Sequence, residues 1–361
     1  MIIKSLELDH YRNYERLDIE FDEGINILYG NNAQGKTNIL ESIYYLGTTK
    51  SHKGSKDKDV IRFGKDESHI RSLVIKNGID YKLDMHLRKS KSKVIAINGN
   101  QIKKASELLG IVNIILFSPE DLSIIKNSPS DRRRFMDLEL CQLDKVYLSN
   151  LSNYNKIVNQ RNTLLKDIWN HPELRDTLDI WDNQLVSLGS KIIERRELFV
   201  SQLNEIINEI HKKLSGEDKL LEINYSPNVT VQDYEKLMMS NREKDIRYKL
   251  TSVGPHRDDF IFMIDGVDVK KFGSQGQQRT VALSLKLSEI ELVKNLTGNP
   301  PILLLDDVLS ELDSNRQNYL LNSIGDIQTI ITCTGLDEFI NNRIHVNQVF
   351  KITNGTIIKE N

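Results

Sequence analysis

One turn, residues 30–37, constrains this chain more than any other stretch, because its sequence Gly-Asn-Asn-Ala-Gln-Gly-Lys-Thr permits few backbone paths. Apolar residues 25–29 precede it as a predicted strand, and apolar residues at helical spacing follow it at Ile39, Leu40, Ile43 and Tyr44. Strand, glycine turn and helix are the context of a phosphate-binding loop, in which backbone N–H groups and the helix N-terminus converge on phosphate oxygens. A chance glycine turn is the alternative, and both flanking elements argue against it.

Within such a loop each residue type has a chemical task. Lys36 is expected to reach the β- and γ-phosphates as a point charge, and Thr37 is expected to place its hydroxyl on Mg²⁺. The backbone around the phosphates would come from Gly30, Asn31, Asn32, Ala33, Gln34 and Gly35. The sequence therefore predicts a site for ATP and Mg²⁺.

Bulk properties exclude several classes of protein. No apolar run approaches the ~20 residues of a membrane span, and the N-terminus lacks the pattern of a signal peptide. The two cysteines, Cys141 and Cys333, lie far apart without metal-ligand spacing, which favours a reducing cytoplasm. With 361 residues and a formal net charge of −2, we expect one large lobe or two linked lobes, and any contact with nucleic acid must use a local patch.

Residues 50–104 are locally basic, with 15 Lys and Arg against 6 Asp and Glu, an excess of +9. The segment also predicts strands at residues 68–74, 81–88 and 93–98. For any single lysine a solvated face is the ordinary interpretation, but the regional excess favours a surface for DNA phosphates. The candidate contacts are Lys50, Lys53, Lys56, Lys89, Lys91, Lys93, Lys103 and Lys104.

Residues 128–216 predict a pair of long helices. Ser128, Pro129 and Asp131 are typical of a helix start, and apolar residues in steps of three and four follow on both sides of a break at residues 170–172. We expect an antiparallel hairpin whose arms have about 40 residues, on the order of 60 Å each at ~1.5 Å per residue. Two ordinary core helices of a bundle are the alternative.

The C-terminal part supplies the rest of the predicted ATP site. Residues 302–307 are four apolar residues and two acids, so that Asp306 would share Mg²⁺ with Thr37 and Asp307 would polarise the attacking water. Before them, Ser274, Gln275, Gly276 and Gln277 open a long helix and form a predicted anion site. Because no second phosphate-binding loop exists, these residues are expected to serve the nucleotide of another subunit in a head-to-tail dimer. An ordinary serine-capped helix is the alternative.

At these residues the chain resembles the ABC-type ATPases, within them the SMC-like branch, and most closely the RecF family of bacterial recombination mediators. The resemblance covers the whole chain and is carried by residues 11–14, 30–37, 49–52, 117–122, 130–135, 254–259, 273–280 and 303–313. It implies the following roles: Walker A for Lys36 and Thr37, Walker B for Asp306 and Asp307, signature for residues 274–277, D-loop for Ser310 and Asp313, and phosphate contacts for Arg12 and Asn13.

The resemblance also implies a fold: an α/β ABC-type P-loop ATPase head, with mixed and parallel sheet, interrupted by an inserted antiparallel helical hairpin. We expect residues 1–127 to form lobe I with the P-loop and the basic surface, and residues 128–216 to form the arm. Residues 217–361 would complete lobe II with the signature, Walker B and D-loop, which makes the ATPase domain discontinuous.

Three positions depart from the family pattern. Gln275 stands where most ABC proteins have glycine, and Asp307 stands where most have glutamate, which fits slow turnover. Thr334 occupies the position of the usual switch histidine. No Q-loop glutamine is evident near Pro119, and residues 254–259 have no assigned role.

By resemblance, the chain would be a slow, DNA-stimulated ATPase that dimerises with ATP and binds duplex DNA next to single-strand gaps. Its expected partners are RecR and RecO, and indirectly RecA and the single-strand-binding protein SSB, in repair, replication restart and SOS induction. The alternatives are another SMC-like ATPase that acts on DNA and the motor subunit of a membrane transporter. The helical insertion, the missing switch histidine and the basic lobe argue against a transporter.

Overall fold

A computed structural model describes residues 1–336 and 346–360, which form two compact units. One unit combines Met1–Asp121 with Glu289–Asn361, and the other is Leu122–Ser288. This division differs from the three expected parts. Strand β12 (Ile302–Asp306) belongs to the sheet of the phosphate-binding loop, and strand β9 (Leu221–Ser226) packs on the helical hairpin.

An antiparallel sheet of six strands forms one layer of the first unit, in the order β2-β1-β4-β5-β6-β7. Its strands alternate buried apolar and exposed polar residues, as a sheet with one solvated face requires. The hairpin between β4 and β5 turns on Asn77 and Gly78, which both have positive φ angles of 53° and 73°. The strands are β1 (Ile2–Tyr11), β2 (Tyr14–Glu20), β4 (Glu67–Lys76), β5 (Ile79–Arg88), β6 (Val94–Ile97) and β7 (Asn100–Gln101).

The second sheet of this unit has the order β15-β14-β3-β13-β12-β8, and its strands from β14 to β8 are parallel. Strands β8, β12 and β13 are buried along their whole length, which confirms the interpretation of residues 302–305 as a strand covered on both faces. The strands are β3 (Ile25–Tyr29), β8 (Ile114–Phe117), β12, β13 (Thr329–Cys333), β14 (Gln348–Thr353) and β15 (Thr356–Glu360).

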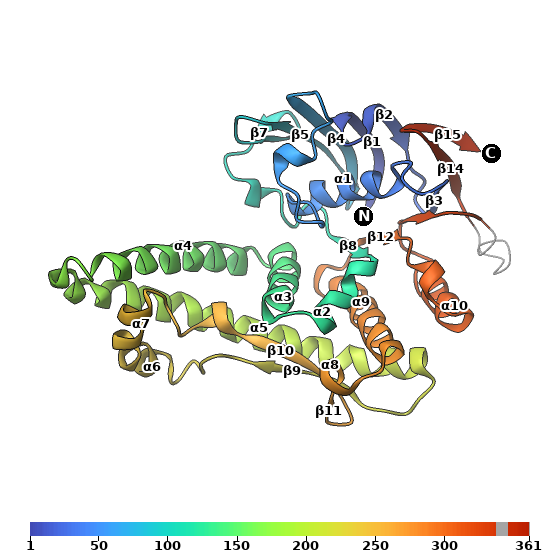
Figure 1. The fold of residues 1–361 in the computed structure, drawn as a ribbon. Helices are drawn as coiled ribbons and strands as arrows, with labels where there is room; N and C mark the ends of the chain where they lie inside the picture. The colour runs from blue at the N-terminus through green and yellow to red at the C-terminus, as the bar shows by residue number, and fades with distance from the viewer. Residues whose placement is uncertain (337–345, 361) are drawn as a thin grey trace. The chain divides into compact units, whose positions relative to one another are not determined.

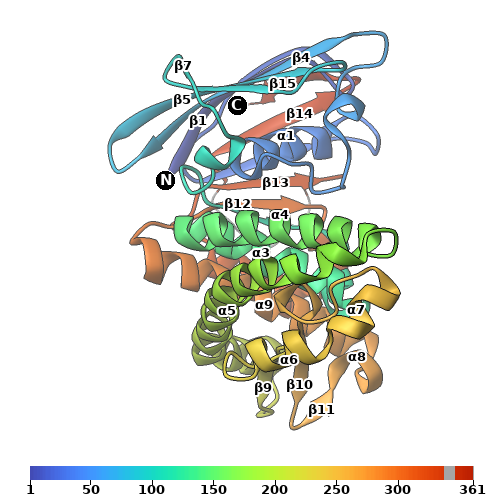
Figure 2. The ribbon, with the colours of Figure 1, turned by 90° about the vertical axis from the view of Figure 1, so that its left-hand side faces the viewer.

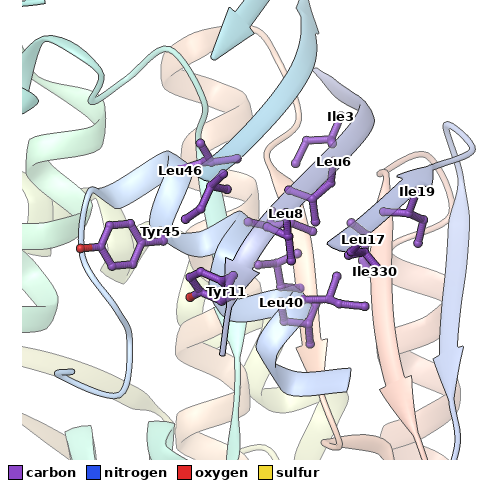
Figure 3. Packing of buried hydrophobic residues seen from close by; sticks show 14 of the residues in the cluster. Ile3, Leu6, Leu8, Tyr11, Leu17, Ile19, Leu40, Tyr45, Leu46 and Ile330 are labelled. Carbon is purple, nitrogen blue, oxygen red and sulfur yellow. The ribbon is translucent and has the colours of Figure 1, made fainter. Parts of the chain in front are cut away.

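One hydrophobic core joins the two sheets through helix α1 (Lys36–Thr48). Figure 3 shows Leu8 of β1, Leu40 of α1 and Ile330 of β13 in this core, and none of the three side chains is exposed. The core therefore fixes the helix that begins at Lys36 against both sheets. Short elements complete the unit: η1 (Asp57–Asp59), η2 (Ala105–Glu107), η3 (Pro119–Asp121), η6 (Leu309–Glu311) and α10 (Ser314–Ser323).

The second unit is built on a helical hairpin, α4 (Lys145–Asp167) and α5 (Leu178–Ser215), joined through η4 (Pro172–Thr177). The two helices lie side by side in both views (Figures 1 and 2). The predicted first arm of about 40 residues is wrong, because the chain breaks at Asp144 into α3 (Pro129–Leu143) and α4. The Asp144 carboxylate accepts from Val146 N at 2.8 Å and from Tyr147 N at 2.9 Å, so it caps a new helix.

The hairpin is not a bare arm, because residues 221–264 pack along it. Helix α5 contacts β9 and α6 (Tyr234–Ser240), and α4 contacts α7 (Arg242–Tyr248). Helices α6 and α7 meet at Asn241, which ends the first and caps the second. The remaining elements are α2 (Leu122–Lys126), η5 (Pro255–Arg257), β10 (Asp259–Ile264), β11 (Val267–Asp268), α8 (Val269–Phe272) and residues 275–288 of α9 (Gln275–Thr297), whose later residues belong to the first unit. Strands β9, β10 and β11 form a three-stranded sheet.

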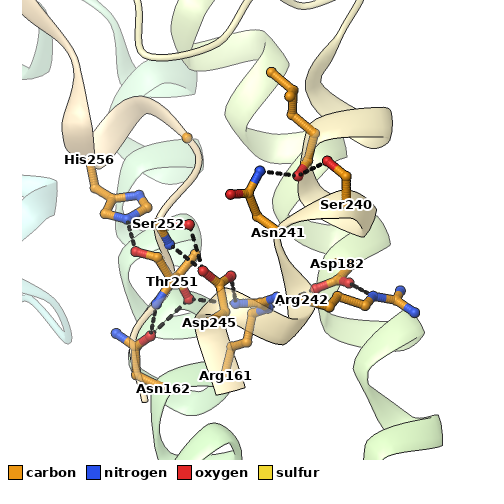
Figure 4. Close-up of polar contacts among 12 residues, drawn as sticks. Arg161, Asn162, Asp182, Ser240, Asn241, Arg242, Asp245, Thr251, Ser252 and His256 are labelled. Atoms are coloured by element: carbon orange, nitrogen blue, oxygen red, sulfur yellow. Dashed lines mark hydrogen bonds and ion pairs between the residues drawn. The ribbon is translucent and has the colours of Figure 1, made fainter. Parts of the chain in front are cut away.

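A buried ionic network binds α4, α5 and α7 together. Arg161 of α4 is fully buried and donates to Asp182 of α5 and to Asp245 of α7, each at 2.7 Å (Figure 4). Arg242 donates to the second oxygen of Asp182 at 2.6 Å. Removal of Arg161 would leave the buried Asp245 without its charged donor, whereas Asp182 would keep Arg242.

Residues 254–259, which the sequence left without a role, are a structural junction. Gly254 has a φ of 130°, and a Cβ atom there would overlap the hydroxyls of Tyr234 and Tyr154. The buried carboxylate of Asp258 accepts from Arg196 at 2.9 Å and from Asn228 N at 2.8 Å. This run therefore ties α4 and α5 to the start of β10.

Candidate nucleotide site

The phosphate-binding loop has the backbone that its glycines predict. Gly30 and Gly35 have φ angles of 147° and 112°, and Ala33 between them has 63°. A Cβ atom at Gly30 would overlap the Ile352 carbonyl oxygen of β14, so this position also requires close backbone approach. The loop leads from β3 directly into α1, which begins at Lys36.

Two neighbouring turns support the loop from outside. The Asn13 side chain donates to Gln34 O at 3.0 Å and accepts from Asn38 at 2.8 Å. On the C-terminal side, Asn354 N donates to the Gln34 side-chain oxygen at 2.6 Å, and Gly355 N donates to Gln34 O at 3.3 Å. The structure thus brings Asn13 to the loop, and it adds a contact from the β14–β15 turn that the sequence did not indicate.

The two halves of the predicted ATP site meet at the carboxyl edge of the parallel sheet. Thr37 Oγ1 donates to Asp306 Oδ1 at 2.8 Å, and Thr332 Oγ1 donates to the same oxygen at 2.8 Å. Lys36, which is 7% exposed, donates from Nζ to Asn31 O at 2.9 Å and to Gly30 O. Burial lowers the pKa of Lys36, and the nearby Asp307 opposes that shift.

Asp307 sits in the left-handed region with a φ of 54°, and its N–H donates to Thr332 Oγ1 at 3.0 Å. Burial and then the Asp306 charge raise the pKa of Asp307, whereas Lys36 lowers it. Its side chain lines a cavity of about 160 Å³ together with Ser310, Thr332 and Thr334. Thr334, at the position of the usual switch histidine, therefore shares a pocket with the predicted catalytic acid.

Thr332 is the functional residue that sequence analysis missed. It lies near the end of β13, between β3 and β12, and its hydroxyl donates to the Asp306 carboxylate and accepts from the Asp307 backbone N–H. The only signal in the sequence is a polar residue near the end of a buried strand, and that signal gains meaning only once the strand order is known.

Arg12, which was expected to touch phosphates, is engaged elsewhere. Its guanidinium donates to both oxygens of Glu41 at 2.7 and 2.6 Å, and to Ser55 Oγ at 2.8 Å. Glu41 lies on α1 and is fully buried, so this pair fixes the β1–β2 turn to the helix that begins at Lys36. A phosphate contact for Arg12 stays a prediction.

The signature residues lie in the other unit, at the start of α9. Ser274 Oγ accepts from Gln277 N at 3.2 Å, and the Gln277 side chain accepts from Ser274 N at 2.9 Å, a reciprocal capping box. Ser274, Gln275 and Gly276 are exposed. The serine-capped helix is therefore present, and service to a second nucleotide stays a prediction.

The D-loop residues have local partners in the first unit. Ser310 Oγ donates to Asp307 O at 2.9 Å, which connects the D-loop to the acidic strand end. Asp313 caps α10 by accepting from Arg316 N at 3.1 Å.

Seven of the eight candidate DNA lysines are exposed, and Lys93 is the exception. Its Nζ lies 3.3 Å from Asp57, donates to Thr49 O and sits 4.7 Å from the centre of the Tyr45 ring. We therefore propose a structural role for Lys93 in place of the predicted contact with DNA. The exposed seven lie in connections rather than on strand faces: Lys50, Lys53, Lys56, Lys89, Lys91, Lys103 and Lys104.

Comparisons with known proteins agree with these features. The chain matches the family described as RecF/RecN/SMC N terminal domain over residues 2–358. It is 62% identical to the DNA replication and repair protein RecF of Lachnospira eligens over 100% of both chains, and 46% identical to that of Clostridium botulinum (strain Langeland) over 99% of both.

Solved structures give the same result. The chain is similar to the recombination mediator protein RecF-ATPrS in the RecFOR pathway, with a TM-score of 0.92 and 36% identity over 100% of this chain and 98% of that one. The Smc head domain from Pyrococcus furiosus shares the fold, with a TM-score of 0.57 and 16% identity over 99% and 96%. These matches confirm the predicted fold class, and the chain belongs to the RecF family of DNA replication and repair proteins.

Proposed function

We propose that this chain is an ATP-dependent recombination mediator, in which ATP closes two protomers on DNA next to a single-strand gap. The observation that carries the proposal is the 2.8 Å hydrogen bond from Thr37 Oγ1 to Asp306 Oδ1, because it joins the phosphate-binding loop to the acidic strand end. A similar protein of the same family has been solved with ATP. The proposed ATP site thus rests on an ATP-bound relative and on the Thr37–Asp306 hydrogen bond in this chain.

The donors at this edge fit Mg²⁺, since Thr37 and Asp306 offer a hydroxyl and a carboxylate oxygen, the ligands that Mg²⁺ prefers. Mg²⁺ held there would neutralise phosphate charge. Lys36 would hold the β- and γ-phosphates, and Asp307 would orient the attacking water and accept its proton. Burial raises the pKa of Asp307, which makes its carboxylate a stronger base than an exposed aspartate. Its side chain is one methylene shorter than glutamate, so we expect slow turnover. A separate part of the proposal is that DNA stimulates this turnover.

The exposed start of α9 is the proposed dimer contact. Ser274 and Gly276 leave a helix N-terminus open to solvent in the protomer, and a helix N-terminus attracts phosphate. In a head-to-tail dimer Ser274 of one protomer would approach the γ-phosphate held by Lys36 of the other. Ser310 would connect that interface to Asp307 through its bond to Asp307 O.

DNA would contact the exposed lysines at phosphates rather than at base edges. Two protomers would present about twice the lysines of one, so ATP should tighten DNA binding most at moderate salt. By reciprocity, DNA should tighten ATP-dependent dimerisation by the same factor. The proposed protein partners are RecR and RecO, with RecA and SSB acting indirectly, in the cytoplasm. Among the described residues, no helix is both long and apolar enough to cross a membrane.

The test is DNA affinity at one fixed salt concentration, with ADP, with ATP, and with ATP and the Asp307→Asn protein. We expect ATP to tighten binding by about tenfold or more through added phosphate contacts, and the Asp307→Asn complex to outlive the wild-type complex. Ser274→Arg is the matched control, since it should keep ATP binding and lose the ATP effect on DNA. Equal affinity in all three states would reject an ATP-gated clamp.

A further inference from the structure

Two histidines lie directly opposite each other on the solvated face of the antiparallel sheet. His69 of β4 pairs with His86 of β5, and their rings stack with centroids 4.1 Å apart and an angle of 14° between planes. Glu67, two residues before His69, points to the same face, and its Oε2 lies 2.8 Å from His86 Nε2. Ligand atoms of all three side chains lie within 4.8 Å of one another.

We propose that Glu67, His69 and His86 bind one divalent first-row transition ion of the Zn²⁺ class. Two imidazole nitrogens and one carboxylate are a donor set that suits Zn²⁺, Co²⁺ or Ni²⁺, whereas Mg²⁺ prefers oxygen ligands alone. The strand register supplies the preorganisation, because the pairing of β4 with β5 fixes the Cα positions of all three residues. This site lies outside the residues assigned to ATP and rests on none of them.

Asp84 is the positioning residue for this site. It stands on the same face two residues before His86, and its Oδ1 lies 3.6 Å from His69 Nδ1. Within the described part of the chain both atoms are buried and have no hydrogen-bond partner. A carboxylate next to the non-ligating ring nitrogen of a metal-bound histidine sets the tautomer and orientation of that histidine. Asp84 would therefore hold the His69 proton on Nδ1 and leave Nε2 for the ion. Arg71 holds the other oxygen of Asp84 at 3.4 Å.

Metal binding at this cluster would have a structural consequence. An ion bound to both histidines would connect β4 to β5 and stabilise the sheet in proportion to its occupancy.

The experiment uses the full chain, stripped with a chelator and kept in excess Mg²⁺ so that oxygen-rich sites are filled. ZnCl₂ is titrated by calorimetry, and CoCl₂ is titrated by visible absorption, which reports nitrogen ligands. We expect one equivalent to bind, with affinity reduced at least about tenfold in His69→Gln and in His86→Gln, and about 10–100-fold in Asp84→Asn, the range for outer-shell partners. Zn²⁺ should raise the melting temperature of the wild-type protein and leave that of His69→Gln and His86→Gln unchanged.

His171→Gln is the matched control, because His171 forms an exposed pair with Glu173, at 3.2 Å, and belongs to no cluster with a second histidine among the described residues. It should bind Zn²⁺ as the wild type does. Circular dichroism checks that each variant is folded. Absence of stoichiometric binding, or equal binding by the wild type, His69→Gln and His86→Gln, would overturn the proposal and leave an ion pair between Glu67 and His86.

Discussion

Replacement of Arg12 by alanine separates two roles for this residue. The resemblance to SMC-like ATPases implies a phosphate contact, whereas the structure shows a bidentate pair with Glu41 at 2.7 and 2.6 Å. Glu41 is fully buried, and the Arg12 side chain is 22% exposed. Without Arg12 the carboxylate would keep the Ser51 hydroxyl as a side-chain donor but would have lost its charged partner.

The expected cost follows from the buried carboxylate. Removal of one partner of a buried ion pair costs about 3–5 kcal/mol, and the partial exposure of Arg12 argues for the lower end, about 3 kcal/mol. The Arg12→Leu, Glu41→Leu double variant should recover much of this loss, because no unpaired charge remains. Arg16→Ala removes an exposed arginine of the neighbouring strand and should change the free energy of unfolding by less than about 0.5 kcal/mol.

The pH dependence gives a second readout. Burial alone would raise the pKa of Glu41, but hydrogen bonds from Arg12 and Ser51 outweigh it and leave that pKa below its usual value. Because the folded-state pKa is depressed, the pair stabilises the protein above the unfolded pKa of about 4.3, and this contribution is lost as pH falls through the folded pKa. The difference between wild type and Arg12→Ala should therefore shrink on acidification.

The assay is urea unfolding without nucleotide, followed by circular dichroism, beside ATP affinity by calorimetry. Both tryptophans, Trp169 and Trp181, belong to the second unit, so their fluorescence reports that unit alone. The reasoning is refuted by an Arg12→Ala protein that unfolds like the wild type in the absence of nucleotide while its ATP affinity falls. That result would make phosphate contact the main task of Arg12.

Two further predictions concern residues that the structure reinterprets. Lys93→Ala should lower stability and leave the slope of log affinity for DNA against log salt concentration unchanged. Lys53→Ala should reduce the magnitude of that slope by roughly 0.9 for each lost phosphate contact. A flatter slope in Lys93→Ala would instead place Lys93 on the DNA surface. Gly254→Ala should destabilise the protein by about 1–3 kcal/mol from backbone strain alone, with the overlap on Tyr234 and Tyr154 adding to it. An unchanged thermal unfolding curve for Gly254→Ala would contradict the structural account of that junction.

The phosphate-binding loop and the acidic strand end were predictable because their information is local. A glycine loop between a strand and a helix specifies its own backbone, and four apolar residues before Asp306 specify a buried strand. Thr332 and Glu41 were not predictable, because their partners depend on strand order and on packing across α1. The break at Asp144 had a local signal, since aspartate is a common N-cap, but no glycine or proline beside it marks the end of the preceding helix.

The status of each lysine was likewise beyond the sequence. Lys93 and Asp57 are 36 positions apart and pair only because the start of β6 approaches the segment after α1. Net charge over a window measures how many basic groups a segment has, but not which of them already have an acidic partner. The same limit applies to Lys89, whose Nζ lies 3.2 Å from Asp66.

The contacts around Glu41 connect the ATP site to the candidate DNA lysines within one compact unit. Asn13 supports the loop through Gln34, and its neighbour Arg12 holds both Glu41 and Ser55. Ser51 donates to the same Glu41 carboxylate, so residues 51–55, between Lys50 and Lys56, are fixed to the helix that Lys36 begins. A continuous chain of hydrogen bonds can transmit a displacement in either direction, provided that residues 51–55 can adopt two arrangements. If a γ-phosphate drew Arg12 away from Glu41, Ser55 would lose its Arg12 donor while Ser51 kept its bond to Glu41, and Lys53 between them would move with the nucleotide state. The Arg12→Ala protein would then bind DNA alike with ATP and with ADP, even where it remains folded.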